Sequence, residues 1–278
     1  MIQDIAPHVY DNAFHERKSL PTDYVAVFEG TKTYLTAGGT FPTVEEVKAL
    51  GAVEEELVYL FTIDEAAFFL LWHVSERVKE ALTPASTQVF RNMQPTHMAL
   101  AGATALHLSV WYRANQFCGC CGSRMRRDQA ERAMRCMDCA NIVYPRINPA
   151  VLAAVRHNGK LLVTHYANRA NATRYALVAG FTEIGETLED TVRREVMEEA
   201  GLPIKNIRYH GSQPWGFAGN IMVGFWAELD RDDETVTLDR TELDEGVWLT
   251  PEEIPPEENP ASLTHTMLQL FRQGKDPK

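Results

Sequence analysis

The first 112 residues contain short runs of apolar and β-branched side chains, separated by charged and turn-forming residues. Residues 24–28 read Tyr-Val-Ala-Val-Phe and residues 57–61 read Leu-Val-Tyr-Leu-Phe, which are compositions typical of strands. Apolar side chains also recur at helical spacing between residues 98 and 111, at Ala101, Ala105, Leu108 and Trp111. The pattern predicts an α/β domain over residues 1–112, with a sheet and covering helices.

The second half of the chain alternates predicted strands with predicted helices. Apolar runs at residues 151–155 and 161–164 flank His157-Asn158-Gly159, and an Asn-Gly pair favours the tight turn of a β-hairpin. Further elements are predicted as strands at residues 175–179, 221–229 and 246–249 and as a final helix at about residues 262–271. Together with a helix after residue 187, these elements predict an α/β/α sandwich within an α+β chain.

An acid-rich segment, residues 180–202, predicts that additional helix. Thr187, followed three residues later by Asp190, is a typical N-cap with an acidic partner, and it comes just after a turn at Gly185 and Glu186. Gly201 can end the helix. The helix should therefore begin just after Glu186 and end at Gly201.

Three carboxylates gather on one side of this predicted helix. At about 3.6 residues per turn, Glu195, Glu198 and Glu199 fall within an arc of roughly 100°. The neighbouring stripe is apolar and is suited to packing (Val192, Val196 and Ala200). Crowded carboxylates repel one another, and Mg²⁺ or Mn²⁺, which prefer oxygen ligands, would turn that repulsion into coordination. The alternative is a solvated, charged helix face, which is the usual meaning of an isolated Glu-rich helix.

Cysteines form two Cys-x-x-Cys pairs at Cys118 and Cys121 and at Cys136 and Cys139, with residues 122–135 between them. This spacing is typical of a tetrahedral zinc ribbon, and four thiolates would leave no open position for water, so the expected Zn²⁺ is structural. Cys120 is the odd cysteine. Two disulfides or a redox dithiol are the alternatives, but the chain has no secretory signal and no thioredoxin-like context.

Composition narrows the class of protein. The chain has 278 residues, 45% of them hydrophobic, which is enough for more than one folded core. The start of the chain lacks a signal peptide, and the longest apolar run, residues 66–72, is too short to span a bilayer, so we expect a soluble, cytoplasmic protein with no membrane partner. A formal net charge of −11 argues against broad electrostatic binding to nucleic acid or anionic lipid.

The spacing of the acid-rich segment resembles the Nudix box at every defining position. Gly180 is followed after five residues by Glu186 and after seven more by Arg194-Glu195-Val196, with Glu198-Glu199 and Gly201-Leu202 closing the pattern. The four cysteines shortly before the box and Ser212-Gln-Pro-Trp215 soon after it are similar to the NADH pyrophosphatase branch of the Nudix hydrolases. The resemblance implies domains over residues 1–112, 113–145 (the zinc ribbon) and 146–278 (the Nudix domain).

The resemblance also implies roles for individual residues. The backbone carbonyl of Ala179 and the carboxylates of Glu195, Glu199 and Glu242 match the family's divalent-metal ligands, with Glu198 completing the cluster; Glu245 could equally be the downstream carboxylate. Residues that match contacts to the dinucleotide are Glu131, Tyr144, Phe181 and, more weakly, Arg91 and Thr264. On sequence alone, a surface arginine is the more common role for Arg91. The remaining matches form the substrate loop (Gln213, Pro214, Trp215, Gly216, Phe217, Ala218, Gly219 and Asn220).

The substrate loop departs from the family pattern, which has prolines on both sides of the phenylalanine and a later serine. Here Gly216 and Ala218 flank Phe217, and Asn220 follows. The aromatic rings could still line a nucleobase pocket, with core packing as the alternative, but the loss of two prolines makes the loop more flexible and affects substrate preference.

The implied activity is metal-assisted hydrolysis of the pyrophosphate of NADH or NAD⁺ to AMP and nicotinamide mononucleotide, with Glu199 or Glu198 orienting or deprotonating the water. The family can also remove an NAD cap from RNA, and it suggests a homodimer. The closest alternative is a Nudix hydrolase of ADP-ribose or of an oxidised nucleoside triphosphate. The other alternative is a binding module that has an inactive Nudix domain, although the intact box argues against it.

Overall fold

The structure is a computed structural model that describes residues 1–15, 17–166, 175–241, 243–257 and 261–276. The chain divides into two compact units. The first unit comprises residues 2–146 and 216–219, and the second comprises Met1 and residues 147–215 and 220–278. No helix in the described ranges is long and apolar enough to cross a membrane.

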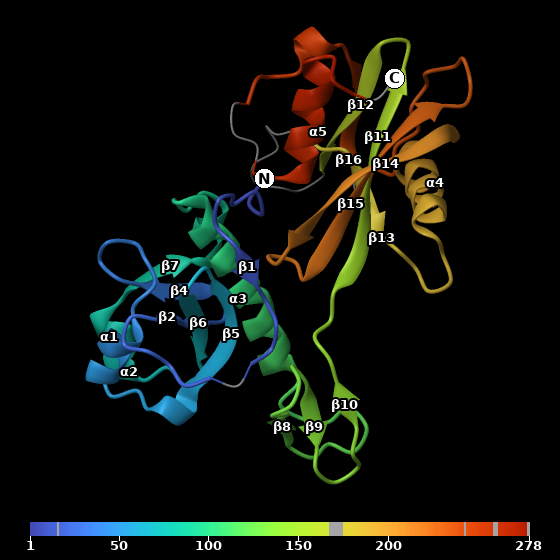
Figure 1. Ribbon diagram of the computed structural model, residues 1–278. Coiled ribbons are helices and arrows are strands. Elements are labelled where there is room, and N and C mark those ends of the chain that lie inside the picture. Colours follow the sequence, from blue (N-terminus) through green and yellow to red (C-terminus); the bar gives the residue numbers. More distant parts are fainter. Residues whose placement is uncertain (16, 167–174, 242, 258–260, 277–278) are drawn as a thin grey trace. The chain divides into compact units, whose positions relative to one another are not determined.

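The first unit contains two small sheets that are covered by helices (Figure 1). One sheet has the order β1 (Tyr10–Asp11), β5 (Leu57–Ile63), β6 (Ala66–Leu71) and β2 (Tyr24–Ala26); the other has the order β3 (Phe28–Glu29), β4 (Lys32–Leu35) and β7 (Thr83–Ser86). The helices are α1 (Val44–Ala49), α2 (Glu76–Ala81) and α3 (Thr96–Ala114), with short 3₁₀ turns η1 (Glu54–Glu56) and η2 (Thr87–Arg91). The helix predicted at residues 98–111 is therefore confirmed as α3, which packs on β5 and β6.

The strand predicted at residues 24–28 is wrong in one respect, because it is two strands. Tyr24–Ala26 pairs with β6, whereas Phe28–Glu29 pairs with β4 of the other sheet. Val27, fully buried between them, marks the crossing of the chain from one sheet to the other. A continuous apolar run does not distinguish one long strand from two short ones.

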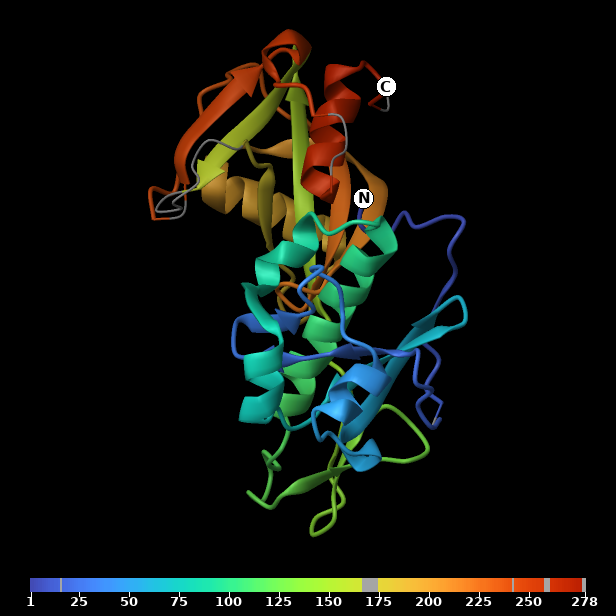
Figure 2. The same ribbon diagram turned by 90° about the vertical axis from the view of Figure 1, so that its left-hand side faces the viewer.

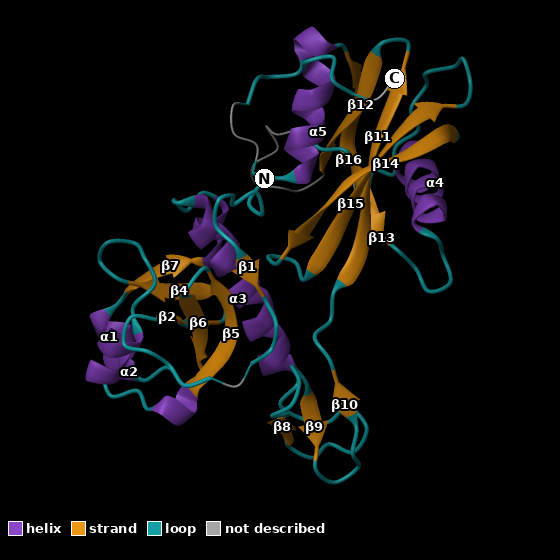
Figure 3. Cartoon of the chain, viewed as in Figure 1, coloured by secondary structure: helices purple, strands orange, loops and turns teal. Residues whose placement is uncertain are grey.

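The zinc-ribbon segment of the first unit is built from short strands and loops (Figure 3). Its antiparallel sheet has the order β10 (Ile142–Val143), β9 (Met134–Cys136) and β8 (Met125–Arg127). Gly122 has φ 77°, the left-handed conformation that glycine adopts without strain, directly after the first cysteine pair.

The second unit is a mixed sheet with one long helix on each face (Figures 1 and 2). Its sheet has the order β14 (Ile204–Trp215), β15 (Asn220–Leu229), β11 (Asn148–His157), β12 (Lys160–Tyr166) and β16 (Leu243–Leu249), with β13 (Val178–Phe181) also paired to β11. The helices are α4 (Leu188–Ala200) and α5 (Leu263–Arg272), and a 3₁₀ turn, η3 (Pro251–Glu253), precedes α5. The predicted hairpin is confirmed, since Asn158 and Gly159 both have positive φ between β11 and β12.

Side chains of the central strand alternate between two cores. Val151, Ala153 and Val155 lie with Val192 and Val196 of α4 in one buried cluster. Leu152 and Ala154 lie with Leu263, Met267 and Phe271 of α5 in the other. Since successive strand residues point to opposite faces, one buried strand supports both helices, and the predicted α/β/α sandwich is confirmed.

One further strand prediction needs correction, and one strand was missed. The strand predicted at residues 175–179 begins later, at Val178, and runs to Phe181, because only those residues pair with β11. Ala176 instead exchanges two backbone hydrogen bonds with Thr164 of β12, at 2.8 and 2.9 Å. The long strand β14 was not predicted at all, since its exposed and half-buried polar positions hide the apolar alternation.

Candidate active site

Helix α4 begins and ends at the predicted residues. The Thr187 hydroxyl accepts a hydrogen bond from the backbone N–H of Asp190 at 3.1 Å, and Glu189 and Asp190 place negative charge in the first turn. Gly201 has φ 67° and donates its N–H to the carbonyl of Met197 at 3.0 Å, a left-handed C-terminal cap. Helix α4 is therefore capped at both of its ends.

The faces of α4 divide as predicted, with one refinement. Val192, Val196 and Ala200 are fully buried in the core. Glu195 and Glu199, one turn apart, are also buried, with exposed fractions of 8% and 3%. Glu198 differs, because 59% of its side chain is exposed. The box therefore has two buried carboxylates and one at the surface.

Gly180 makes room for one of the buried carboxylates. A Cβ atom at position 180 would lie 1.9 Å from Cδ of Glu195 and 2.1 Å from both of its carboxylate oxygens. No side chain fits there, so the carboxylate of Glu195 lies directly against the backbone of β13. The carbonyl of Ala179, the residue before, belongs to the same strand.

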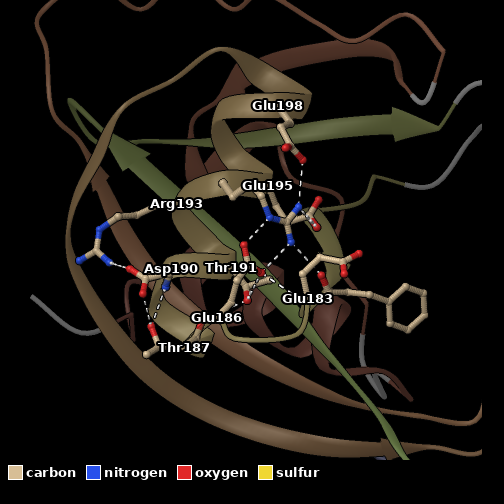
Figure 4. A network of polar contacts seen from close by, with 10 residues as sticks. Glu183, Glu186, Thr187, Asp190, Thr191, Arg193, Glu195 and Glu198 are labelled. Atoms are coloured by element: carbon tan, nitrogen blue, oxygen red, sulfur yellow. Dashed lines mark hydrogen bonds and ion pairs between the residues drawn. The ribbon is translucent and has the colours of Figure 1, made fainter.

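Arg194 is the centre of a polar network that holds the box together, and Figure 4 labels its carboxylate partners Glu186, Glu195 and Glu198. Its Nε and Nη2 donate to the two carboxylate oxygens of Glu186 at 2.6 and 3.0 Å. Its Nη1 donates to Glu195 at 2.8 Å and to Glu198 at 2.9 Å, and its Nη2 also donates to the carbonyl of Phe181 at 2.9 Å. Arg194 thus pairs with Glu186 through two hydrogen bonds, and the same guanidinium reaches two more carboxylates.

The loop before α4 is fixed through Glu186. The Arg194 guanidinium and the backbone N–H of Glu183 lower the pKa of this carboxyl to about 2, and its hydrogen bonds to Glu186 in turn raise the pKa of Arg194. Thr191, which the sequence analysis missed, also donates its hydroxyl to Glu186, at 3.0 Å. A threonine at the start of the second helical turn carries no distinguishing sequence signal.

The oxygen donors of the box suit a hard divalent cation. Glu195 and Glu199 bring two buried carboxylates to one side of α4, beside the strand that carries the Ala179 carbonyl, and carboxylate and carbonyl oxygens are the ligands that such cations prefer. Glu242 lies outside the described residues, and Glu245 of β16 is exposed. Within the described ranges, these carboxylates do not form a set of three whose ligand atoms all lie within 4.8 Å of one another.

The four cysteines of the ribbon do form such a set. The ligand atoms of Cys118, Cys121, Cys136 and Cys139 all lie within 4.8 Å of one another. The Sγ atoms of Cys118 and Cys139 are 3.6 Å apart, and those of Cys121 and Cys136 are 3.5 Å apart. A tetrahedron with metal–sulfur distances of about 2.3 Å has edges of about 3.8 Å, so the four sulfurs fit Zn²⁺. Backbone N–H groups of Cys121 and Cys120 lower the pKa of the Cys118 thiol to about 6, while Cys120 itself is exposed and outside the set.

Two residues at the ends of the predicted substrate loop are buried. Gln213 is 1% exposed, and its side-chain amide donates to the carbonyl of Ala261 at 3.0 Å and accepts from the N–H of Leu263 at 2.7 Å. Gln213 thus holds the N-terminus of α5, where Thr264 is half-buried. Asn220 is 6% exposed at the start of β15.

The middle of the loop, residues 216–219, belongs to the first unit and packs on α3. A Cβ atom at Gly216 would lie 2.1 Å from the carbonyl oxygen of Ala103, so only glycine allows this approach. The guanidinium carbon of Arg91 lies 5.0 Å from the centre of the Phe217 ring, within the range of a cation–π contact. The structure therefore brings together Arg91 and Phe217, while Pro214 and Ala218 are exposed and Trp215 and Gly219 are half-buried.

Of the remaining predicted contacts, Tyr144 and Phe181 are exposed and Glu131 is half-buried. The hydroxyl of Tyr144 donates to Glu131 at 3.0 Å, and this hydrogen bond raises the pKa of Tyr144. The side chain of Tyr144 is 54% exposed, and Phe181, at the end of β13, is 51% exposed. Exposed aromatic rings can stack on a nucleobase without displacing core contacts.

Comparison with known proteins identifies both parts of this arrangement. Residues 146–270 match the NUDIX domain, and residues 113–144 match the NADH pyrophosphatase zinc ribbon domain. The chain is 40% identical over 156 residues to the NAD-capped RNA hydrolase NudC of Erwinia tasmaniensis, covering 56% of this chain and 58% of that protein. It is 38% identical over 170 residues to the protein of the same name from Salmonella schwarzengrund, covering 61% of this chain and 65% of that protein. The chain thus spans less than two thirds of the length of these relatives.

Solved structures similar to this chain include a NUDIX hydrolase from Nitrosomonas europaea. Its sequence is 26% identical, and the TM-score is 0.44. The match covers 50% of this chain and 80% of that chain.

Proposed function

We propose that the chain is a member of the NADH pyrophosphatase branch of the Nudix hydrolases and that it hydrolyses the pyrophosphate of NADH or NAD⁺ to AMP and nicotinamide mononucleotide. We also propose that it removes NAD from the 5′ end of capped RNA, since the cap contains the same linkage. The relatives named as NAD-capped RNA hydrolases support this substrate class.

The observation that carries the proposal is the pair of buried carboxylates on α4, in a chain that also has the NADH pyrophosphatase ribbon. Burying a carboxylate costs free energy unless a charge partner compensates. Glu195 receives a hydrogen bond from Arg194, and both Glu195 and Glu199 offer oxygens to a cation. A site built only for stability would need no second acidic residue at such depth.

Mg²⁺ or Mn²⁺ is the catalytic cation of this proposal. Glu195, Glu199 and the carbonyl of Ala179 would hold it, with Glu198 completing the cluster and Glu242, or alternatively Glu245, as the downstream ligand. When bound, the cation would neutralise phosphate oxygens and lower the pKa of a water molecule. Zn²⁺ in the four cysteines has a structural role, one ion per chain.

The water that attacks the pyrophosphate is oriented or deprotonated by Glu199 or Glu198. The two differ in what holds them: Glu198 is at the surface and bonded to Arg194, whereas Glu199 is buried. The pH profile of kcat separates them, because only replacement of the general base by glutamine removes its acidic limb.

Contacts to the dinucleotide in this proposal come from aromatic and polar groups, most of them exposed or half-buried. We assign Phe181, Tyr144 and Glu131 to this role, together with the substrate loop from Gln213 to Asn220, and more weakly Arg91 and Thr264. The burial of Gln213 indicates that its contribution is to hold α5 and the loop end in place.

We further propose that the chain works as three domains, at residues 1–112, 113–145 and 146–278, as a homodimer in the cytoplasm. Sedimentation of the zinc-loaded chain tests the dimer.

A second substrate class, ADP-ribose or another nucleoside diphosphate derivative, is the alternative because the substrate loop departs from the family pattern. Gly216 and Ala218 stand where the family has prolines, and Gly216 lies against the Ala103 carbonyl, where no proline ring fits. The loop that contacts the base therefore has its own shape in this chain.

A substrate panel with Mg²⁺ and with Mn²⁺ tests the proposal, with products identified by chromatography. Release of AMP and nicotinamide mononucleotide from NADH, faster than the hydrolysis of ADP-ribose, is the expected result. Efficient hydrolysis of ADP-ribose or a nucleoside triphosphate, without release of AMP from NADH, would show that the assigned substrate is wrong. The assignment of the box carboxylates to the metal site would not be affected.

A further inference from the structure

The zinc ribbon differs in charge from the rest of the chain. Residues 113–144 contain six arginines and three acidic residues, a formal charge of +3 in a chain of −11. Four thiolates around Zn²⁺ would lower this value to about +1. The ribbon is thus a basic segment in a strongly acidic protein, so the net charge of the whole chain does not apply to the ribbon.

Three of the six arginines share one face of the ribbon sheet. Arg126 of β8 lies directly opposite Arg135 of β9, so the two side chains share a face. Arg124 is two residues before Arg126 and therefore points the same way. The other face carries Met125 opposite Cys136, both buried, so the thiolate of Cys136 lies on the side away from these three arginines.

This arrangement is costly in the absence of an anion. Like charges directly opposite on neighbouring strands destabilise a sheet. Asp128 compensates Arg135, with a carboxylate oxygen 2.6 Å from its Nε. Arg124 and Arg126 are exposed, and within the described residues neither forms an ion pair. Two uncompensated guanidinium groups beside a third provide a site for phosphate oxygens.

Exposed aromatic rings lie at both ends of the same face. Phe117 pairs with Arg124 in an isolated β-bridge, and its side chain is 65% exposed. At the other end, Glu131 accepts from the Tyr144 hydroxyl at 3.0 Å and lies 3.8 Å from Nη2 of Arg135. Aromatic rings interleaved with cationic groups are how proteins bind single-stranded nucleic acid, by base stacking and phosphate contacts.

We propose that this face, formed by Phe117, Arg124, Arg126, Arg135 and Tyr144, binds the first nucleotides of a single-stranded RNA chain behind its 5′ cap. The inference rests on the proposed function, because Tyr144 is there assigned to the cap dinucleotide. The face continues from Tyr144 along the ribbon, so it meets the part of the substrate that free NADH lacks. It therefore favours capped RNA over the free dinucleotide.

The test compares NADH with an NAD-capped RNA of ten nucleotides, using the full-length, zinc-loaded chain. The double variant Arg124→Gln/Arg126→Gln should lose roughly tenfold in kcat/KM on the capped RNA and change less than about twofold on NADH. The salt dependence of kcat/KM on the capped RNA should become shallower by about 1.4 in log–log slope, for two phosphate contacts. Arg77→Gln on α2, which removes one exposed arginine outside the ribbon, is the control for an arginine lost elsewhere and should change neither value. Arg124→Lys/Arg126→Lys keeps the charge and should keep the parent slope.

Equal losses on both substrates, or no loss on capped RNA, would overturn the proposal. A change in sedimentation of the double variant would also overturn it, since the face would then be a contact between copies of the chain. Fluorescence anisotropy with an uncapped ten-nucleotide RNA separates this inference from the proposed function. If the parent hydrolyses neither substrate, weaker binding of that RNA by the double variant still supports the face, and equal binding rejects it.

Discussion

The cysteine cluster and the box carboxylates are both sets of metal-ligand side chains, but the structure holds them in different ways. The four sulfurs already lie within 4.8 Å of one another. In the box, the charges are held by Arg194, which donates to Glu186, Glu195 and Glu198. The four sulfur atoms thus surround a common centre, which we call the closed site. Three of the box glutamates instead accept hydrogen bonds from one arginine, Arg194, and we call the box the open site.

The difference follows from what each site must do. A structural site gains stability when all of its ligands converge, as four short strand and turn segments achieve here. A catalytic site must keep a coordination position open for water or substrate, so its protein ligands do not fill the whole coordination shell. Arg194 supplies the positive charge that keeps the carboxylates in place without closing the site.

The largest effect that we expect is on catalysis, and it tests the open site. Glu199→Gln should reduce hydrolysis of NADH by at least about 100-fold at saturating Mg²⁺ and leave thermal unfolding close to the parent, because it removes one anionic ligand. Glu189→Gln, an exposed residue on the same helix, is the control. Activity within about tenfold of the parent would remove Glu199 from the site.

At the closed site, the four cysteines, we expect substitutions to lower the stability of the fold. Cys136→Ser should lose bound zinc and lower the midpoint of thermal unfolding, because the remaining sulfurs no longer complete the tetrahedron. Cys120→Ser is the matched control, since its thiol lies outside the set and should leave zinc content unchanged. Metal analysis and calorimetry of the two variants decide the point, and loss of zinc from the Cys120 variant would contradict the ligand assignment.

A third change tests the space that Gly180 of the backbone leaves for the carboxylate of Glu195. Gly180→Ala should lower kcat/KM by roughly 10- to 100-fold, because the new Cβ forces the carboxylate of Glu195 to move, and misplacement by about 1 Å can cost that much. Gly211→Ala in β14 is the control, since its Cβ would meet nothing within 4 Å. Steady-state kinetics across Mg²⁺ concentrations provide the measurement; a parent-like response to Mg²⁺ would show that the carboxylate of Glu195 adapts.

The smallest effect concerns pH and the arginine network. The pKa of Glu186 falls from 4.5 to about 2 in the folded chain, so its contribution to stability is complete above pH 4.5 and is lost as pH falls toward 2. Glu186→Gln should therefore lower the unfolding midpoint near neutral pH, and the difference from the parent should narrow through that window. The comparison is with Glu183→Gln, whose side chain is exposed. A difference that stays constant with pH would mean that Glu186 acts through shape rather than charge.

Local signals explain why much of both sites could be predicted from the sequence. Thr187, Gly201 and the cysteine spacings act over a few residues, and the structure places them as expected. The apolar stripe of α4 is likewise set by helical period alone.

Features that depend on distant partners could not be predicted. The sequence places Gln213 in a loop, but its side chain is buried because α5 begins against it, at Leu263, 50 residues later in the chain. The burial of Glu195 depends on the absence of a Cβ at Gly180, and the close packing of Gly216 depends on Ala103 of α3. Such contacts have no periodicity, so only the tertiary structure reveals them.

The compactness of the cysteine set in the sequence has a consequence for the order of folding. Its four ligands come from residues 118–139, whereas the sandwich requires Asn148 and its neighbours in β11 to find β15, whose pairing begins at Asn220. Closing a short loop costs less chain entropy than closing a long one, and local contacts form faster than distant ones. The ribbon should therefore assemble while much of the sandwich is still unstructured. During refolding with zinc, cysteine thiols should become protected from alkylation before the amides of β11 and β15 become protected from hydrogen exchange.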